Sequence, residues 1–254
     1  MAVSHQREST VVVTGGAQGI GEMLCTDLAA RGYCVVVADR NAEESEAVVR
    51  AIRGTGGHAS ALHVDVADEA SCAGAAALLE QEHEDLVGLV NNAAVFSTLE
   101  MKPFWEIPLD EWNHVLSVNL TGTWLMSRAM LPLLRRAQSA SIVNISAAAV
   151  WFGRADYAHY VSSKAGVIGL TRAMARELGP LGIRANAVTP GSVQTGVTRS
   201  TVTPEQREAI VRAQCLPRAL TPEDMRSSVA FLLDPASAAI TGQVVNADGG
   251  MVMR

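Results

Sequence analysis

The sequence lacks the patterns that mark membrane, secreted and nucleic-acid-binding proteins. No stretch approaches the roughly 18 apolar residues needed to span a bilayer, and the opening MAVSHQREST lacks the basic and apolar regions of a signal peptide. Lysine and arginine are scattered, and the net charge is only −6, so the electrostatic footprint of a nucleic-acid-binding surface is missing. We therefore expect a cytoplasmic protein that binds neither a membrane nor a nucleic acid.

The cysteines are too few and too far apart for a disulfide framework or a zinc site. No two of them form a CxxC pair; they are Cys25, Cys34, Cys72 and Cys215. This spacing is typical of buried thiols in a reducing compartment. We expect buried thiols and no bound metal.

What the sequence does have is a regular alternation of two apolar patterns over 254 residues, a length that suits one domain, 1–254. Continuous runs rich in valine and isoleucine are typical of strands that are covered on both faces of a parallel sheet. The expected strands are Thr10–Thr14, Tyr33–Asp39, Ala59–Val66, Leu86–Asn91, Ser141–Ser146, Arg184–Thr189 and Gln243–Ala247.

Between these runs, apolar residues recur with the 3.6-residue period of a helix. The first such segment ends naturally at Gly32, and one of its faces carries Ile20, Met23, Leu24 and Leu28. Because the alternation has no linker or repeat, we predict an α/β fold with a single doubly wound parallel sheet of the Rossmann type and helices on both faces. The other expected helices are Ala42–Arg53, Asp68–His83, Leu109–Ala137, Ala158–Leu178 and Pro222–Leu233.

The segment Thr14–Gly21, which reads TGGAQGIG, lies between the first expected strand and helix. Glycines there let the backbone turn sharply and approach a pyrophosphate at the positive N-terminus of the helix. A (β/α)8 barrel of similar length would not explain this turn. It also lacks the Lys-Ser/Thr ending of a Walker motif, which argues against a nucleoside triphosphatase.

The second expected strand ends at Asp39, 24 residues after Gly15. A carboxylate there can accept hydrogen bonds from both hydroxyls of an adenosine ribose. It would repel a 2′-phosphate, and Gln18 offers no cation in the turn to receive one. Arg40 alone would favour a phosphate, and it can equally be a solvated surface charge. These residues favour NAD over NADP.

Tyr160 and Lys164 are four residues apart in an expected helix, so their side chains share one face. An ammonium close to a phenol favours the phenolate and lowers the tyrosine pKa from its reference value near ~10. Tyr160 could then act as general base on an alcohol, or as acid on a ketone, during hydride transfer. Such a pair alone is usually ordinary helix surface, and the glycine-rich turn is what reverses that interpretation. We expect the neighbouring His159 to face away.

Six motifs in the right order resemble the short-chain dehydrogenase/reductase family over nearly the whole chain. They are TGGAQGIG, Asp65-Val66, Asn91-Asn92-Ala93-Ala94, Asn119, the Tyr160–Lys164 pair, and Pro190-Gly191 with Thr195. One departure is that Ala94 replaces the last glycine of the family's NNAG segment. The stretch VWFGRADYAHYVSSKAG also resembles the phenylethanol dehydrogenase branch.

The resemblance implies a catalytic set and a cofactor-binding set. Tyr160 would transfer the proton, Lys164 would also hold the nicotinamide ribose, and Asn119 would anchor a water that links the lysine to solvent. The cofactor-binding residues it implies are Gly15, Gln18, Gly19, Ile20, Gly21, Asp39, Arg40, Asp65, Val66, Asn92, Lys164, Pro190, Gly191 and Thr195.

The serine that the family usually places thirteen residues before the tyrosine is absent, because that position is Ala147. Ser146 is one residue further back, and in a regular strand its hydroxyl would point away from the cleft unless a bulge rotated it inward. Three interpretations remain open. The chain is a natural variant with a donor from elsewhere, or a cofactor-binding relative with weak activity, or a chain whose serine was changed deliberately to trap a ligand.

The resemblance also places a substrate pocket and a substrate lid, the latter at about 192–217. Aromatic and apolar walls suggest a hydrophobic or aryl-substituted secondary alcohol or ketone. Apolar surface on the long helices, and a tail at Asp248–Met251 that resembles the family's interface, suggest a homotetramer. The expected pocket residues are Ala147, Trp151, Phe152, Tyr157 and Phe96.

The sequence therefore predicts an oxidoreductase that transfers a hydride between NAD and a secondary alcohol or ketone. One alternative is a 3-oxoacyl thioester reductase, which Asp39 disfavours because NAD suits oxidation. The other is a weakly active or non-catalytic NAD-binding relative. Ala147 makes that alternative credible, whereas the presence of Tyr160, Lys164 and Asn119 argues against it.

Overall fold

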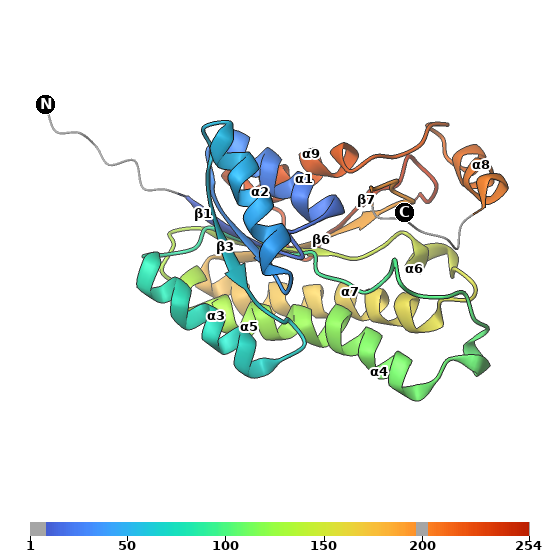
Figure 1. Cartoon of the computed structure of the whole chain (residues 1–254), viewed down its shortest axis with the longest axis horizontal. Helices are drawn as coiled ribbons and strands as arrows, with labels where there is room; N and C mark the ends of the chain where they lie inside the picture. Colours follow the sequence, from blue (N-terminus) through green and yellow to red (C-terminus); the bar gives the residue numbers. More distant parts are fainter. Residues whose placement is uncertain (1–8, 197–202, 254) are drawn as a thin grey trace, which may run out of the picture.

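Within residues 9–196 and 203–253, which the computed structural model describes, the chain folds around a seven-stranded parallel sheet (Figure 1). The strands lie in the order β3-β2-β1-β4-β5-β6-β7. They are β1 (Thr10–Thr14), β2 (Cys34–Asp39), β3 (His58–His63), β4 (Gly88–Asn91), β5 (Ala140–Ile145), β6 (Ile183–Pro190) and β7 (Val244–Ala247). The predicted strands are thus present, with changes only at their ends.

Helices cover both faces of the sheet (Figure 1). One layer consists of α1 (Gly19–Ala30), α2 (Ala42–Gly54) and α9 (Glu223–Leu233). The opposite layer consists of α3 (Glu69–Glu82), α5 (Gly122–Leu134) and α7 (Ala158–Leu178). Three further α-helices of the described residues are α4 (Leu109–Leu116), α6 (Ala149–Phe152) and α8 (Pro204–Ala213). The doubly wound α/β fold is therefore confirmed.

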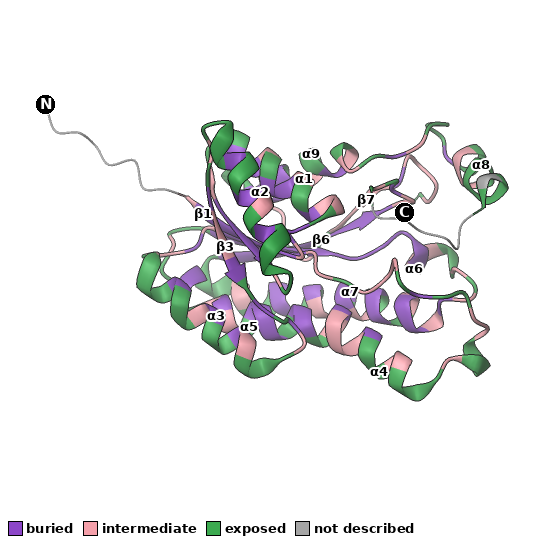
Figure 2. Cartoon of the chain, in the orientation of Figure 1, coloured by how far each residue is buried: buried purple, intermediate pink, exposed green. Residues whose placement is uncertain are grey.

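Residues of the central strands alternate between the two layers. Val11 and Val13 pack with α1, α2 and α9, whereas Val12 between them packs on the opposite face. All three are fully buried, and burial of each such side chain contributes about 1.5–3 kcal/mol. Burial on both faces explains why the strands are continuous apolar runs, and Figure 2 shows the buried residues along the sheet.

The long helix predicted over Leu109–Ala137 is present from Leu109 to Leu134, but it contains a π-helical turn that the sequence did not predict. The segment consists of α4, a π-helical turn over Ser117–Thr121, and α5, which ends at Leu134. A π turn admits one extra residue and rotates the side chains that follow it around the helix axis. The apolar period does not reveal such a turn.

The sheet reverses its strand order between β1 and β4, and ligand crevices of such folds open at the carboxyl ends of the strands beside this reversal. Here the segments after the two strands are joined directly. The Asn92 side-chain nitrogen donates to the main-chain oxygens of Thr14, at 3.0 Å, and Gly15, at 3.1 Å. Asn92 thus fixes the glycine-rich turn against the end of β4.

The expectation of buried thiols is right for two cysteines only. Cys25 and Cys72 are buried, whereas Cys34 is half-buried and Cys215, beyond the end of α8, is exposed. Burial raises the pKa of the Cys72 thiol to about 11 and that of Cys25 further. None of the helices in the described ranges is long and apolar enough to cross a membrane.

Candidate active site

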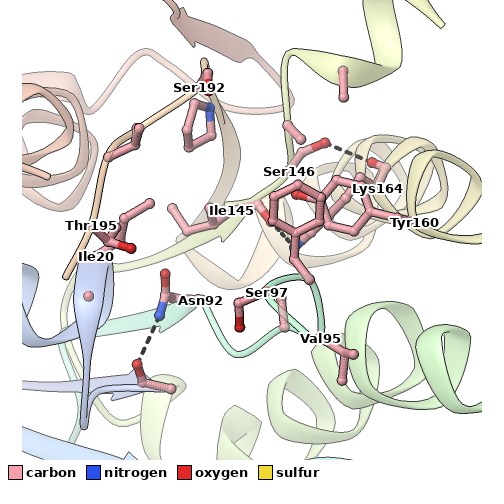
Figure 3. Close-up of a pocket in the computed structure, with 18 of the residues that line it drawn as sticks. Ile20, Asn92, Val95, Ser97, Ile145, Ser146, Tyr160, Lys164, Ser192 and Thr195 are labelled. Atoms are coloured by element: carbon pink, nitrogen blue, oxygen red, sulfur yellow. Dashed lines mark hydrogen bonds between the residues drawn. The ribbon is translucent and has the colours of Figure 1, made fainter. Parts of the chain in front are cut away.

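A cavity of about 550 Å³ opens at the carboxyl ends of the strands (Figure 3). The predicted site residues that line it are Gly15, Gln18, Gly19, Ile20, Asp39, Arg40, Asp65, Val66, Asn92, Phe96, Ala147, Phe152, Tyr160, Lys164, Pro190, Gly191 and Thr195. The predicted site residues outside the lining are Gly21, Asn119, Trp151 and Tyr157.

The turn after β1 has the close backbone packing that suits a pyrophosphate. Gly15 has a φ of 63°, and a Cβ there would lie 2.8 Å from the Cα of Ala93. A Cβ on Gly21 would lie 1.9 Å from the main-chain oxygen of Gly15. Gly21 therefore acts from behind the cavity, by letting α1 approach the turn. Because α1 begins at Gly19, the unpaired N–H groups of its first turn lie at the cavity wall.

Asp39 is held at the end of β2 by two main-chain N–H groups. The N–H of Ala17 donates to Oδ2 at 3.2 Å, and that of Asn41 donates to Oδ1 at 3.0 Å. Each carboxylate oxygen keeps a lone pair for a further donor. Arg40 also lines the cavity, but its side chain is exposed.

Tyr160 and Lys164 lie in the first two turns of α7 and reach the cavity, although they are only 8% and 3% exposed. The Lys164 ammonium donates to the main-chain oxygen of Ile145, at the end of β5, at 2.8 Å (Figure 3). Burial lowers the pKa of Lys164 to about 8, because desolvation disfavours the charged form.

The Ser146 hydroxyl is occupied by a structural contact. It donates to the main-chain oxygen of Lys164 at 2.7 Å and so ties the end of β5 to α7 (Figure 3). Ala147, which is buried and lines the cavity, has no polar atom in its side chain. The hydroxyl beside the cavity is therefore directed at the backbone of α7.

The chain from β5 into Ala147 is regular. The N–H groups of Ser146 and Ala148 donate to the main-chain oxygens of Val188 and Pro190, at 2.8 and 2.9 Å. These alternate bonds continue the parallel pairing with β6 at its normal spacing. The bulge that could have rotated Ser146 inward is absent from this stretch.

Asn119 lies in the π-helical turn and is completely buried. Its Oδ1 accepts from the Val95 N–H at 2.7 Å, and its Nδ2 donates to the Val95 oxygen at 3.2 Å and to Ser163 Oγ at 3.1 Å. Ser163 Oγ donates in turn to the main-chain oxygen of Tyr160 at 2.7 Å. The Asn119 side chain thus joins the segment after β4 to the backbone of Tyr160.

Two predicted pocket aromatics lie behind the lining. The Trp151 indole donates to Asn246 Oδ1 at 3.0 Å, which directs it toward β7. Tyr157 is only 1% exposed and packs against Phe96, with ring centroids 5.5 Å apart. Phe152 lines the cavity instead. Which face of the short helix α6 carries each ring depends on these tertiary partners.

His159 also lies outside the cavity lining, as expected for a residue that faces away from the site. It is fully buried, and its Nε2 lies 3.0 Å from Glu111 Oε1 in α4. Lys102 Nζ lies 2.6 Å from the other oxygen of Glu111 and holds the pKa of that carboxyl below its usual range. The pair anchors the start of α7 to α4.

The sequence analysis missed the contribution of α8. Thr203 and Gln206 form a capping box, in which Thr203 Oγ1 accepts from the Gln206 N–H and Gln206 Oε1 accepts from the Thr203 N–H. The sequence TPEQ at 203–206 carries the pattern of a capping box and could have predicted the start of this helix. Gln206 and Ile210 line the cavity, so α8, which lies within the predicted lid at 192–217, forms part of the cavity wall. Residues 197–202 of that prediction lie outside the described residues.

The buried ammonium predicts a pH-dependent stability difference between the wild type and Lys164→Met. The pKa of Lys164 falls from 10.5 in the unfolded chain to about 8 in the folded one. The cost of burying the charge is therefore fully present below about pH 8 and is relieved as the pH rises toward 10.5. At about 1.4 kcal/mol for each pKa unit this is roughly 3 kcal/mol. In urea unfolding without cofactor, the free energy of unfolding of the wild type should increase by that amount relative to the variant as the pH rises across this window.

Lys102→Met is the matched control. The hydrogen bond to Glu111 raises the pKa of Lys102 above 10.5, so this lysine stays charged in both states over the same window. Its stability difference from the wild type should not change there. A flat difference for Lys164→Met as well would contradict the buried-charge account.

The chain is similar to known oxidoreductases over almost its whole length. A family profile described as enoyl-(acyl carrier protein) reductase matches residues 15–252. Cyclopentanol dehydrogenase of Comamonas sp. is 34% identical over 244 residues, 96% of each chain. The 3-oxoacyl-[acyl-carrier-protein] reductase of Synechocystis sp. is 36% identical over 245 residues, 95% of this chain and 96% of that one. A solved structure from Sinorhizobium meliloti 1021, provisionally described as a short-chain alcohol dehydrogenase, has a TM-score of 0.90 at 30% identity and covers 96% of both chains. The chain belongs to the short-chain dehydrogenase/reductase family of oxidoreductases, whose dehydrogenases use a nicotinamide cofactor.

Proposed function

We propose that this oxidoreductase transfers a hydride between NAD and a hydrophobic or aryl-substituted secondary alcohol or ketone. The observation that carries the proposal is that one cavity contains the glycine-rich turn, Asp39 and the Tyr160–Lys164 pair. A dinucleotide-binding turn beside a proton-transfer pair fits hydride transfer coupled to proton transfer. Similarity to cyclopentanol dehydrogenase, whose name describes a secondary alcohol, supports the substrate class.

The described residues fit an extended dinucleotide along the carboxyl edge of the sheet. The tight turn that Gly15 and Gly21 allow, with the N-terminus of α1 at the cavity wall, suits a pyrophosphate. Asp39 would accept hydrogen bonds from the adenosine ribose, and Gly191 and Thr195 would hold the nicotinamide end. When bound, NAD supplies the hydride acceptor for alcohol oxidation, and its reduced form supplies the hydride donor for ketone reduction.

Tyr160 would take the hydroxyl proton of the alcohol as the carbinol C–H bond releases its hydride and the C=O bond forms. In ketone reduction it would return that proton to the oxygen. The Lys164 ammonium, fixed on the oxygen of Ile145, would favour the Tyr160 phenolate and hold the nicotinamide ribose. Asn119 fixes the backbone of Tyr160 through Ser163, and we propose that it also anchors a water that links Lys164 to solvent.

The charge at the end of β2 supports NAD rather than NADP. Asp39 is fixed by two main-chain hydrogen bonds and would repel the 2′-phosphate of NADP. Arg40 could attract that phosphate, but its side chain is exposed, so solvent screens it. The fixed carboxylate therefore decides the preference.

Apolar side chains supply much of the other half of the cavity wall. Phe96 stacks on Tyr160, with ring centroids 4.3 Å apart and an interplanar angle of 29°. Met101, Phe152 and Ile210 also line this half. An aryl or other hydrophobic group would bury its surface against these side chains while its carbinol carbon lies beside Tyr160.

A 3-oxoacyl thioester reductase is the second candidate. The similarity to the Synechocystis reductase favours it, whereas Asp39 disfavours it because NAD suits oxidation. A weakly active NAD-binding relative is the third candidate, and it rests on Ala147 alone.

We also propose that the chain forms a homotetramer through its long helices. Trp124 on α5 is 43% exposed, with the Arg128 guanidinium 4.6 Å from its ring centroid. A subunit contact through α5 and α7 would bury this apolar surface, which a monomer leaves in water.

The reduction of NAD and NADP by a panel of secondary alcohols, followed by absorbance, tests the function and the cofactor. We expect kcat/KM to be on the order of 10² higher with NAD, because like charges brought together cost several kcal/mol. Asp39→Asn should narrow this ratio by about tenfold or more. Arg40→Gln is the control, and it should lower only the residual use of NADP. A wild type that prefers NADP contradicts the Asp39 argument, and no turnover of any alcohol with either cofactor contradicts the substrate class.

Ala147→Ser should raise turnover, because it would restore a hydrogen-bond donor to the reacting oxygen. A preorganised donor of this kind is worth about 10²–10³ in kcat. The control is Ala155→Ser, which adds a hydroxyl at another alanine of the same lining and should leave kcat unchanged. Equal kcat values for the wild type and Ala147→Ser would show that the missing donor does not limit the reaction.

A further inference from the structure

Arg154 and Asp156 bring charge to the half of the cavity that the proposed function assigns to the substrate. Their described neighbours in that half of the lining are apolar or neutral: Phe96, Ser97, Met101, Phe152, Ser192, Gln206 and Ile210. The other charged residues of the lining are Asp39, Arg40 and Asp65, at the end assigned to adenosine, and Lys164, which is bonded to Ile145.

Arg154 is held against aromatic rings next to the reacting groups. Its guanidinium carbon lies 4.7 Å from the ring centroid of Tyr157 and 5.7 Å from that of Phe96. Phe96 in turn stacks directly on Tyr160. Such cation–π contacts stabilise a positive charge at this position by about 0.5–2 kcal/mol. Only the Phe96 ring then separates the guanidinium from Tyr160, the proton-transfer residue.

The backbone around Arg154 is fixed in a bent conformation. Gly153 and Asp156 have φ values of 61° and 63°, and Asp156 is the only non-glycine residue of the described chain with a positive φ. The Arg154 N–H donates to the Ala149 oxygen at 3.2 Å, and the Asp156 oxygen accepts from the Lys102 N–H at 3.1 Å. Arg154 lies between Gly153 and Asp156, and both Arg154 and Asp156 line the cavity.

The Arg154 guanidinium forms no hydrogen bond or ion pair with any described residue, and neither does the Asp156 carboxylate. Some arginines of the described residues have carboxylate partners, as in the pairs Arg128–Glu69, Arg136–Glu80 and Arg218–Asp224. Others, such as Arg40 and Arg50, have none within the described chain, so Arg154 is distinguished by lying unpaired in the half of the cavity assigned to the substrate. A substrate that covered Arg154 without pairing with it would remove its hydration at a cost of several kcal/mol. A substrate that covers Arg154 is therefore expected to carry an acceptor for it.

We propose that Arg154 binds a carboxylate of the substrate, so that the substrate is a hydrophobic hydroxy acid or the matching oxo acid. The proposal rests on the hydride-transfer function proposed above and narrows its substrate. The guanidinium fork matches both oxygens of a carboxylate. Asp156 also lines this half of the cavity, and its negative charge disfavours a dianion such as a phosphate monoester.

Matched acids and esters test the proposal. The substrates are benzoylpropanoate and benzoylbutanoate, which place the carboxylate at two distances from the ketone, and their methyl esters. The wild type should reduce at least one acid with a KM about 10- to 100-fold lower than that of its ester, in line with a charge-assisted hydrogen-bonded pair. Arg154→Gln should raise the KM of that acid by the same factor and leave the KM of its ester unchanged.

Two further variants separate charge recognition from packing. Arg154→Lys keeps the charge but loses the fork, so it should recover part of the acid preference. Asp156→Asn removes the neighbouring negative charge and should increase that preference. Binding provides a second readout. Quenching of the fluorescence of the enzyme saturated with reduced cofactor should give a lower Kd for phenylbutanoate than for methyl phenylbutanoate. Arg154→Gln should abolish the difference between the two Kd values.

Several outcomes would overturn the proposal. If the wild type reduces the esters and simple aryl ketones but shows no preference for either acid, the carboxylate assignment is wrong and the hydride-transfer function stands. If Arg154→Gln lowers kcat equally for acid and ester, Arg154 acts by packing on Phe96 and Tyr157. If no ketone is reduced and phenylbutanoate does not bind, both this proposal and the proposed function are wrong.

Discussion

The site depends on the reciprocal link between the end of β5 and helix α7. The Lys164 ammonium donates to the oxygen of Ile145, and the Ser146 hydroxyl donates to the oxygen of Lys164. These two bonds run in opposite directions and fix both the side chain and the backbone of the lysine. Desolvation of the ammonium opposes this arrangement and lowers its pKa to about 8, while apolar burial on both faces of the sheet stabilises it. The Ser146 hydroxyl is committed to this link, and Ala147 beside it brings no polar side-chain atom to the cavity.

The two ends of the cavity are fixed by different means. At the end proposed for the cofactor, Asn92 donates a hydrogen bond to the main chain and Asp39 accepts one from it, so the backbone at the ends of the strands fixes these polar groups. At the substrate end, the side chains rest on one another: Phe96 stacks on Tyr160, and Arg154 lies against Phe96. The first arrangement suits a shared cofactor, and the second can change from one family member to another with a few substitutions, which is where substrate choice would reside.

The sequence predicted the doubly wound fold because burial on both faces leaves continuous apolar runs, as in Val11–Val13. The order of the motifs predicted most of the residues that meet in the cavity, since the carboxyl ends of parallel strands share one edge. The sequence did not predict the π-helical turn at Asn119, because one extra residue in a turn barely alters the apolar period. It also misplaced Trp151, whose direction depends on a partner nearly a hundred residues away, Asn246. Arg154 escaped notice because an arginine in a loop gives no signal until its lack of a carboxylate partner is visible.

Direct transfer of hydride between substrate and cofactor is tested most directly with a secondary aryl alcohol that carries deuterium on its carbinol carbon. After turnover with NAD, mass spectrometry of the reduced cofactor should find one deuterium, turnover should show a primary isotope effect, and Tyr160→Phe should form almost no labelled cofactor. Reduced cofactor without deuterium, or labelled cofactor formed equally fast by Tyr160→Phe, would contradict the proposed reaction at this site.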